Sequence, residues 1–384
     1  MAKVIVRGPL LTQSGYGVHS RQIVKWLIDA GHEVSCQVLP WGVTPWYLNS
    51  DSLDGLVGKI MERTAEPQMK PDYSFQIQLP DEWDTAIANK NFGVTAAVET
   101  NFCNPAWIGA CNNMDGIIVP SNFTAGVLRN SGKLTTRVHV IPESFPDVFC
   151  QEAKSTKFFN LKSKRNFLLF GQLTAPNPDL DRKNTFNAIK WFCEQFQGRK
   201  DVGLVIKTNM GTNSSLDRRL TFRTLKKVLQ EVRPGKFPRV TLLHGNITDQ
   251  QLFKMYCDRS LVGLITATRG EGYGLPMIEA SAAGLPVLAT DWSGHKTFLQ
   301  DGSWIPVKYN MIKVPNERID NRVFMQNSLW ADVDENDFKK ALKQLYNGRA
   351  ELKKNASKSR KTILGKFSHI AVSKLYDSFL QELG

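Results

Sequence analysis

Short apolar runs alternate with amphipathic stretches along the first part of the chain. The apolar runs have the length of buried strands and lie at residues 3–8, 32–40, 73–80, 92–100, 116–120 and 137–142. Amphipathic stretches separate several of them. Residues 20–31, for example, place Ile23, Trp26 and Leu27 on one helical face before Gly31. This alternation predicts a mostly parallel, doubly wound sheet.

A second alternation follows residues 146–164, which break the pattern and are predicted to form an interdomain linker. Its apolar runs lie at 165–171, 203–208, 240–245, 261–268 and 286–290, with 303–309 as a further candidate strand. Helical patterns occupy 184–196 and about 215–232, and the end of the chain is helical. The sequence therefore predicts an α/β fold of two Rossmann-like, doubly wound domains, 1–150 and 165–364, facing one another across a cleft.

Composition narrows the class of protein. No apolar stretch approaches the roughly 20 residues that a membrane span requires. The N-terminal residues run directly into the first strand, without the pattern of a signal peptide. The six cysteines are scattered, without metal-like spacing, and are interpreted as reduced thiols. We expect a cytoplasmic protein with no stable membrane insertion.

The charge is divided unevenly between the two halves of the chain. Residues 1–160 hold 13 Lys and Arg against 15 Asp and Glu, whereas residues 161–384 hold 36 against 21. The net charge of +13 therefore lies entirely in the second half. Two stretches concentrate it: residues 216–239, with eight basic and two acidic residues, and 353–366, with six basic residues and no acid.

The stretch TRGEGYGLPMIEASAAGLPVLAT, residues 268–290, is the most informative in the sequence. Glu271 follows the apolar run 261–268. Pro276 suits the first turn of a helix, and Gly284 is a natural stop. The unit is strand, glycine loop, helix and strand, with the loop at the carboxyl end of the sheet. Sheets of this kind bind ligands at that edge.

The glycine loop combines features that suit two parts of one ligand. Gly272 and Gly274 allow close approach of a ligand to the backbone, and a helix beginning near Leu275 directs N–H groups toward a phosphate. Carboxylates would repel a diphosphate, but Glu279 can accept hydrogen bonds from ribose hydroxyls, and Glu271 from a polyhydroxylated group beyond the phosphates. This pattern predicts a nucleotide sugar. The alternative is that both glutamates are solvated charges beside an ordinary turn.

The same stretch resembles the signature of the retaining family 4 glycosyltransferases of GT-B fold, with Glu271 and Glu279 as its E-x7-E pair. SGYGVHSRQI, residues 14–23, resembles the mobile glycine loop of that family, and residues 99–132 resemble its "ET…W…N.MD.I.VPS.F…SG" segment. The resemblance implies transfer from a sugar nucleotide, retention at the anomeric carbon, no cofactor and no metal. It also implies that the last helix, 367–384, crosses back to the first domain.

The sequence departs from the family at one place. The family often has an arginine directly after the glycine of the strand, where this chain has Gln172. The longer loop APNPDLD, residues 175–181, precedes Arg182 and Lys183. The resemblance assigns the cations that bind the diphosphate to Lys183 and Arg182.

Departure of a nucleoside diphosphate builds negative charge, which fixed cations and backbone N–H groups must stabilise when no metal is present. Lys183, Arg182 and the amides near Gly274 are predicted to do this. Lys207, at the end of a strand, is a further candidate for binding the sugar nucleotide. The alternative interpretation is that Lys207 is an ordinary solvated lysine. Glu271 is expected to position hydroxyls rather than act as a nucleophile.

The first half supplies candidates for the opposite side of the site. Gly15 and Gly17 would let a loop close over the phosphates, as in the family. Glu99 and His19 are predicted on the acceptor side, although His19 is equally compatible with a structural role. Asp179 and Asp181 form a D-x-D that is interpreted as a turn and not as a metal site.

Other classes of protein explain less of the sequence. A nicotinamide-dependent dehydrogenase should show G-x-G-x-x-G after its first strand, and RGPLLTQSGYG lacks that spacing. A non-catalytic nucleic-acid-binding protein would use the basic half but not GEGYGLPMIE. A hydrolase or epimerase on this fold is a third alternative.

The acceptor is predicted from charge and resemblance together. The glycine motifs resemble a branch of the family often encoded by tailed bacteriophages, some members of which modify hydroxymethylated bases in phage DNA. Basic side chains would neutralise the phosphates of a duplex while the modified base reaches the donor sugar. We therefore expect double-stranded DNA containing 5-hydroxymethylcytosine as the acceptor, with a cell-surface glycan or a lipid-linked acceptor as the alternative.

Overall fold

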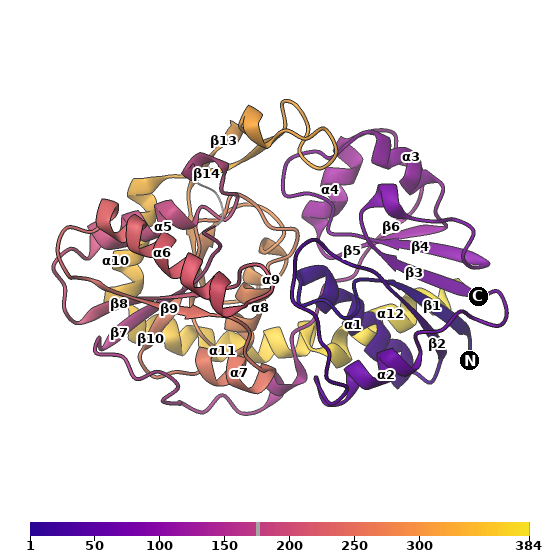
Figure 1. Ribbon diagram of the computed structural model, residues 1–384, viewed down its shortest axis with the longest axis horizontal. Helices are drawn as coiled ribbons and strands as arrows, with labels where there is room; N and C mark the ends of the chain where they lie inside the picture. The colour runs from indigo at the N-terminus through magenta and orange to yellow at the C-terminus, as the bar shows by residue number, and fades with distance from the viewer. Residues whose placement is uncertain (174–176, 384) are drawn as a thin grey trace. The chain divides into compact units, whose positions relative to one another are not determined.

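The computed structural model describes residues 1–173 and 177–383, which form two compact units (Figure 1). The first unit comprises Met1–Ser144, Asp320–Ser328 and His369–Gly384. The second comprises Phe145–Ile319 and Leu329–Ser368. The chain therefore passes between the units four times. Part of the predicted loop 175–181, namely residues 175 and 176, lies outside the described residues.

The first unit contains a six-stranded parallel sheet in the order β2-β1-β3-β4-β5-β6. Its strands are β1 (Lys3–Gly8), β2 (Glu33–Val38), β3 (Tyr73–Ile77), β4 (Lys90–Val94), β5 (Gly116–Val119) and β6 (Val138–Val140). Each coincides with a predicted apolar run. The order reverses between β1 and β3, and the loops that follow the strands at such a switch point are where ligands bind.

Helices cover both faces of this sheet (Figure 1). They are α1 (Gly15–Asp29), α2 (Leu56–Glu62), α3 (Ala106–Asn112), α4 (Asn122–Asn130) and α12 (His369–Gln381), with a 3-10 turn η1 (Pro80–Glu82). One core cluster joins the sheet to α1 and α12. In this cluster Trp26 stacks on Tyr376 with ring centroids 4.7 Å apart, and Phe379 lies edge-on to Phe92. The final helix is thus part of the first unit.

The second unit contains a six-stranded parallel sheet in the order β12-β11-β10-β7-β8-β9. Its strands are β7 (Arg165–Phe170), β8 (Val202–Thr208), β9 (Arg239–His244), β10 (Leu261–Ile265), β11 (Val287–Thr290) and β12 (Trp304–Val307). Numbered within the unit, this is the Rossmann order 3-2-1-4-5-6. The switch point lies between β7 and β10, which pair directly.

Two core clusters fill the two faces of the second sheet. The helices are α5 (Thr185–Gln195), α6 (Ser215–Val232), α7 (Asp249–Tyr256), α8 (Leu275–Ala282), α9 (Lys296–Leu299), α10 (Glu335–Asn347) and α11 (Arg349–Phe367), with 3-10 turns η2 (Asp147–Cys150), η3 (Pro178–Leu180) and η4 (Asn316–Arg318). Helices α5, α6 and α10 bury their apolar faces in one cluster, and α7, α8, α9 and α11 in the other. Figure 1 shows α5 and α6 on one side of the sheet and α7 and α11 on the other. The prediction of two doubly wound α/β units is confirmed.

Residues 146–164 are not a free linker. Phe149 is fully buried in a core cluster of the second unit. Farther along, the amides of Phe158 and Phe159 both donate to the Asp258 carboxylate, at 2.7 and 2.9 Å. The absence of strand or helix periodicity suggested a linker, but the large apolar side chains fasten the segment to the second unit.

An antiparallel pair, β13 (Tyr309–Lys313) and β14 (Leu329–Val333), was not predicted. Its strands belong to the second unit, whereas residues 320–328 between them group with the first. Arg322 on this segment binds the carboxylates of Asp81 and Glu82, each at 2.7 Å. The segment is therefore anchored in the first unit by ion pairs.

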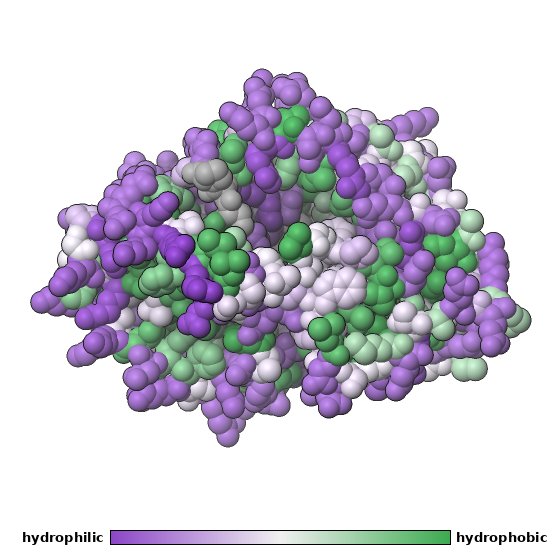
Figure 2. All heavy atoms as spheres, viewed as in Figure 1, coloured by the Kyte–Doolittle hydropathy of each residue, from purple (hydrophilic) through white to green (hydrophobic). Residues whose placement is uncertain are grey.

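The surface is largely polar on the face drawn in Figure 2, where apolar side chains form scattered patches. Among the helices of the described chain, none combines the length and the hydropathy needed to cross a membrane.

Candidate active site

The switch point of the second sheet brings together two loops that are far apart in the sequence. The chain leaving β7 leads to Arg182 and Lys183 just before α5, and the chain leaving β10 leads through Glu271 to α8. Because β7 and β10 are parallel neighbours, their carboxyl ends lie at the same edge of the sheet. The sequence predicted these residues at one site, and the fold supplies the reason for their proximity.

Glu271 is the centre of this cluster. Lys183 Nζ lies 2.5 Å from Glu271 Oε1, and Arg182 Nη1 lies 3.4 Å from Oε2. Thr268 Oγ1 donates a third contact to Oε1 at 3.0 Å. Arg182 also donates to the Gly270 carbonyl. The carboxylate is therefore held by two cations and a hydroxyl, on a residue that is only 8% exposed.

The electrostatics keep Glu271 ionised. Burial raises the pKa of this carboxyl, but Lys183 and Arg182 outweigh burial and lower it to about 2. A carboxylate that stays charged near neutral pH accepts hydrogen bonds and donates none. Glu271 is thus suited to hold hydroxyl groups.

The segment 293–295 supports Glu271 and was not predicted from the sequence. The Glu271 amide donates to Ser293 Oγ at 3.0 Å, and Ser293 Oγ lies 3.4 Å from His295 Nδ1. His295 Nε2 lies 2.7 Å from the Thr290 carbonyl, which can only accept, so Nε2 carries the proton. Burial lowers the pKa of His295 and favours the neutral ring. This chain of bonds fixes the backbone at Glu271.

Within the segment 293–295, Gly294 packs directly against the backbone of the glycine loop. Its amide donates to the Glu271 carbonyl at 2.8 Å. A Cβ on Gly294 would lie 1.9 Å from the Gly272 carbonyl oxygen, so only glycine fits there. The signal in the sequence was the run SGH two residues after β11, the strand next to the one that precedes the glycine loop.

Glu279 and Lys207 form a second polar group in this unit. Tyr256 donates its hydroxyl to Glu279 Oε2 at 2.9 Å. Burial raises the pKa of Glu279 to about 8, and the nearby Lys207 charge opposes this only in part. Lys207 is 6% exposed and donates to Asn209 and to the Gly245 carbonyl. Lys207 is therefore a buried cation near Glu279, which excludes the alternative of a solvated lysine.

The start of α8 has the geometry of an anion site. Gly274 is its N-cap residue, with φ 107°, a conformation that side chains rarely adopt. Leu275 and Pro276 open the helix, and Gly274 has no side chain with which to cap it. Pro276 has no N–H and the Met277 amide donates to the Gly274 carbonyl at 3.0 Å, which leaves the Leu275 amide as the donor of this turn. Gly272, in the loop just before, is buried. The amides and the helix dipole provide positive potential here.

Arg269, which is 2% exposed, holds the loop before Lys183 in place. Its Nη1 donates to the carbonyls of Pro178, Asp179 and Asp181, at 2.9, 3.2 and 2.8 Å. Asp181 uses both carboxylate oxygens to accept the amides of Lys183 and Thr185. Asp181 thus caps α5, consistent with the interpretation of the D-x-D as a turn.

The predicted glycine loop of the first unit is in fact the first turn of α1. Ser14 caps this helix by accepting the Gly17 amide at 3.0 Å, so Gly15 and Gly17 are helical. A Cβ on Gly17 would lie 2.2 Å from the Thr12 carbonyl oxygen, whereas one on Gly15 would meet nothing within 4 Å. Glycine is required at position 17 for close packing after β1, at the switch point of the first sheet. A role for either residue toward phosphates stays a prediction.

His19 and Glu99 also lie in the first unit. His19 is 4% exposed, and its Nε2 lies 3.2 Å from the Tyr376 hydroxyl on α12. Burial lowers the pKa of His19 to about 4, so the ring is neutral. The structure thus gives His19 a packing role. Glu99 is half-buried in the loop after β4. The acceptor-side assignment of both residues stays a prediction.

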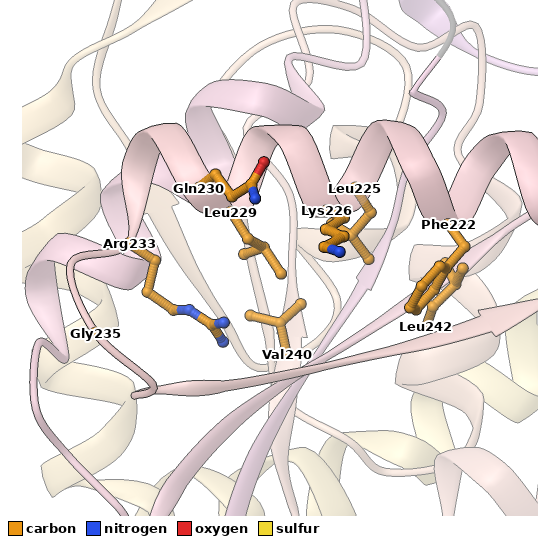
Figure 3. A pocket seen from close by; sticks show the side chains of 9 residues that line it. All are labelled: Phe222, Leu225, Lys226, Leu229, Gln230, Arg233, Gly235, Val240 and Leu242. Carbon is orange, nitrogen blue, oxygen red and sulfur yellow. The ribbon is translucent and has the colours of Figure 1, made fainter.

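A separate groove of about 460 Å³ lies between α6 and the edge strand β9 (Figure 3). Leu225 and Leu229 on the helix face Val240 on the strand, and Arg233 extends toward the strand at one end. None of the predicted site residues lines this groove.

Comparisons with known proteins agree with this geometry. The profile of one family, described as family 4 glycosyltransferases in conflict systems, matches residues 160–373, more than half of the chain. Sucrose synthase from Denitrovibrio acetiphilus is 26% identical over 183 residues, which are 42% of this chain and 23% of that enzyme. The chain thus spans less than a quarter of the length of that curated relative.

Solved structures resemble the whole chain. Sucrose-phosphate synthase from Thermosynechococcus elongatus has a TM-score of 0.67 at 15% identity, covering 99% of this chain and 98% of that one. HepE from Anabaena, in complex with UDP and glucose, has a TM-score of 0.64 at 12% identity, covering 99% and 100%. At these identities the likeness shows the fold alone. The predicted GT-B fold is confirmed.

Proposed function

We propose a function that proceeds from the family of this chain, which belongs to the family 4 glycosyltransferases in conflict systems. The chain transfers a sugar from a nucleoside diphosphate sugar to an acceptor hydroxyl, with retention at the anomeric carbon and without a metal. The observation that carries the proposal is the contact of Lys183 and Arg182 with Glu271, one loop before the uncapped N-terminus of α8. Cations for a diphosphate and a carboxylate for sugar hydroxyls then occupy adjoining positions.

In the proposed reaction, the bond between the anomeric carbon and the diphosphate oxygen breaks, and negative charge develops on the phosphate. Lys183, Arg182 and the amides at the start of α8 stabilise that charge. Glu271 orients the sugar hydroxyls. Because two cations already bind its carboxylate, Glu271 is a poor nucleophile. The acceptor hydroxyl therefore forms its bond to the anomeric carbon from the face that the diphosphate leaves, and its proton passes to the departing phosphate oxygen.

Glu279 binds the nucleoside in this proposal. The oxygens of its carboxyl group accept hydrogen bonds from the ribose hydroxyls, while Lys207 adds positive charge on the same side. UDP-glucose is the first donor to test, because HepE, with a similar fold, has been determined in complex with it.

The test uses glutamate variants. We expect Glu279→Ala to weaken donor binding in calorimetry by about tenfold and Glu271→Ala to abolish transfer. Glu231→Ala, on the exposed surface of α6 in the same unit, is the matched control and should retain both properties. Unchanged donor affinity and turnover in both site variants would refute the site assignment.

Metal independence has its own test. Transfer should persist in excess EDTA, because cations of the protein stabilise the leaving group. Activity that is lost with EDTA and restored by magnesium would contradict this part of the proposal and would return Asp179 to consideration as a ligand.

The acceptor in this proposal is 5-hydroxymethylcytosine in double-stranded DNA, in the cytoplasm of the host cell if the protein is phage-encoded. The support is the basic excess of the second half of the chain, which α6 displays as exposed Arg219 and Arg223 among others. The measurement is transfer of labelled sugar to hydroxymethylated duplex DNA, with affinity followed against salt. Transfer only to a glycan or lipid-linked acceptor, or an affinity for duplex DNA that does not change with salt concentration, would exclude the DNA acceptor. Either result would leave the glycosyltransferase proposal intact.

A further inference from the structure

A second pocket of the second unit lies at the opposite edge of its sheet from Glu271. The pocket has a volume of about 380 Å³ and is lined by the start of β10, the end of α8 and the start of α11. Leu261 opens β10 at this pocket, while Glu271 follows the other end of the same strand. The pocket is therefore distinct from the candidate active site.

The charge of this pocket is one-sided. Four cationic side chains line it, and no carboxylate does: Arg259, Arg349, Lys353 and Lys354. Within the described chain, none of the four forms an ion pair or a side-chain hydrogen bond. Four like charges without ion-pair partners around one hollow repel each other, and an anion bound there would relieve the repulsion.

The nearest acid is already occupied. Asp258 is 1% exposed, and its Oδ2 accepts the amides of Phe158 and Phe159. Its Oδ1 accepts the amide and the hydroxyl of Ser260. Glu351 on α11 lies outside the pocket lining. The charge of Asp258 raises the pKa of Lys353 and so offsets the positive charge of the pocket in part, but one carboxylate leaves the four cations in excess.

Two further features add to the positive potential of the pocket. Arg349 and Ala350 open α11, a helix of 19 residues whose N-terminus has no side-chain cap, so its free amides and dipole face this region. Lys353 is exposed as a whole residue, but burial of its ammonium group, followed by the nearby Arg349 charge, lowers its pKa. The positive charge of Arg349 thus acts directly on the Lys353 ammonium group.

We propose that this pocket binds a small phosphorylated molecule through its phosphate or diphosphate group. Guanidinium and ammonium groups that converge on a hollow match phosphate oxygens in charge and hydrogen-bonding capacity. The volume falls in the range of small-ligand sites, roughly 300–1,000 Å³. This site goes beyond the proposed function and needs neither the donor sugar nor the acceptor.

The test is calorimetric titration with inorganic pyrophosphate. The background carries Lys183→Gln and Arg182→Gln, which removes the cations of the active site from the measurement. We expect pyrophosphate to bind this background and to lose about tenfold or more in affinity when Arg349→Gln and Lys353→Gln are added. Lys358→Gln with Lys361→Gln, an equal charge loss on the same helix outside the pocket, should leave affinity unchanged.

Circular dichroism checks that each variant folds. The pocket and control substitutions lie at exposed residues, and glutamine at 182 and 183 keeps N–H donors near the Glu271 carboxylate. An unmodified duplex oligonucleotide is titrated in parallel. No pyrophosphate binding at millimolar concentration, or equal losses in the pocket and control variants, would overturn the proposal. Duplex binding that depends on the pocket cations while pyrophosphate does not bind would also overturn it, because the occupant would then be a nucleic-acid backbone.

Discussion

Gly294→Ala tests how the loop around Glu271 is held in place. Gly294 belongs to no recognised motif, yet its Cα packs against the backbone of the glycine loop. An added Cβ would lie 1.9 Å from the Gly272 carbonyl oxygen, 2.4 Å from the Gly272 carbonyl carbon and 2.8 Å from the Glu271 carbonyl oxygen. All three contacts are to backbone, so no side-chain rotation relieves them.

The size of the effect follows from these distances. To restore an ordinary contact, the Gly272 carbonyl must retreat by about 1 Å or more. Overpacking of this kind costs about 1–3 kcal/mol of stability. A displacement of about 1 Å in a residue that positions the substrate lowers turnover roughly 100-fold. We therefore expect a folded protein whose transfer rate falls about 100-fold, with the Glu271 loop displaced.

The assay compares kcat/KM for transfer with the melting temperature of each variant. Gly365→Ala on α11 is the control, because an added Cβ there meets nothing within 4 Å and the substitution lies in the same unit. Melting temperature separates loss of fold from loss of loop geometry. A folded Gly294→Ala with kcat/KM within twofold of the native protein would refute the reasoning.

Three further outcomes are expected. Between about pH 4.5 and pH 8 the folded state holds more protons on Glu279 than the unfolded state does, so this group makes the free energy of unfolding fall as pH rises through that window. Glu279→Gln should remove this contribution when urea unfolding is measured across pH. The same dependence of the unfolding free energy on pH in the variant and the native protein would contradict the argument from burial. Arg269→Met leaves three carbonyls of the 178–181 loop without their donor and should cost about 3 kcal/mol in urea unfolding, whereas Arg219→Met on the surface of α6 should cost under about 0.5 kcal/mol. Gly17→Ala should lower the melting temperature through its clash with Thr12 while Gly15→Ala does not; equal melting temperatures would show that the first turn of α1 relaxes freely.

Local patterns predicted the elements around the candidate site well. The segment from β10 through α8 to β11 carries apolar strands, a proline in the first helical turn and a glycine stop, and each signal acts over a few residues. The proximity of Lys183 to Glu271 was predicted from the resemblance and is explained by the pairing of β7 with β10. Strand order is a long-range property that apolar runs do not encode.

Other features depended on contacts that the sequence does not display. The start of α1 at Gly15 was missed because glycines disfavour helix, yet the Ser14 cap and the close approach of Gly17 to Thr12 outweigh that preference. The roles of Ser293 and Gly294 arise from packing across one strand. The strands β13 and β14 have five residues each, and three of the five residues of β13 are exposed, so the alternation was too weak to recognise.

The route of the chain has a consequence for the order of folding. The core of the first unit includes Val372, Tyr376 and Phe379, so it remains incomplete until residues 369–383 have been synthesised. The sheet of the second unit needs only residues 165–307. During translation the unit encoded first must therefore finish last, and it exposes an unfilled apolar face while the rest of the chain emerges. Cutting the gene near codon 150 would produce a first unit without α12 and should yield an aggregating fragment.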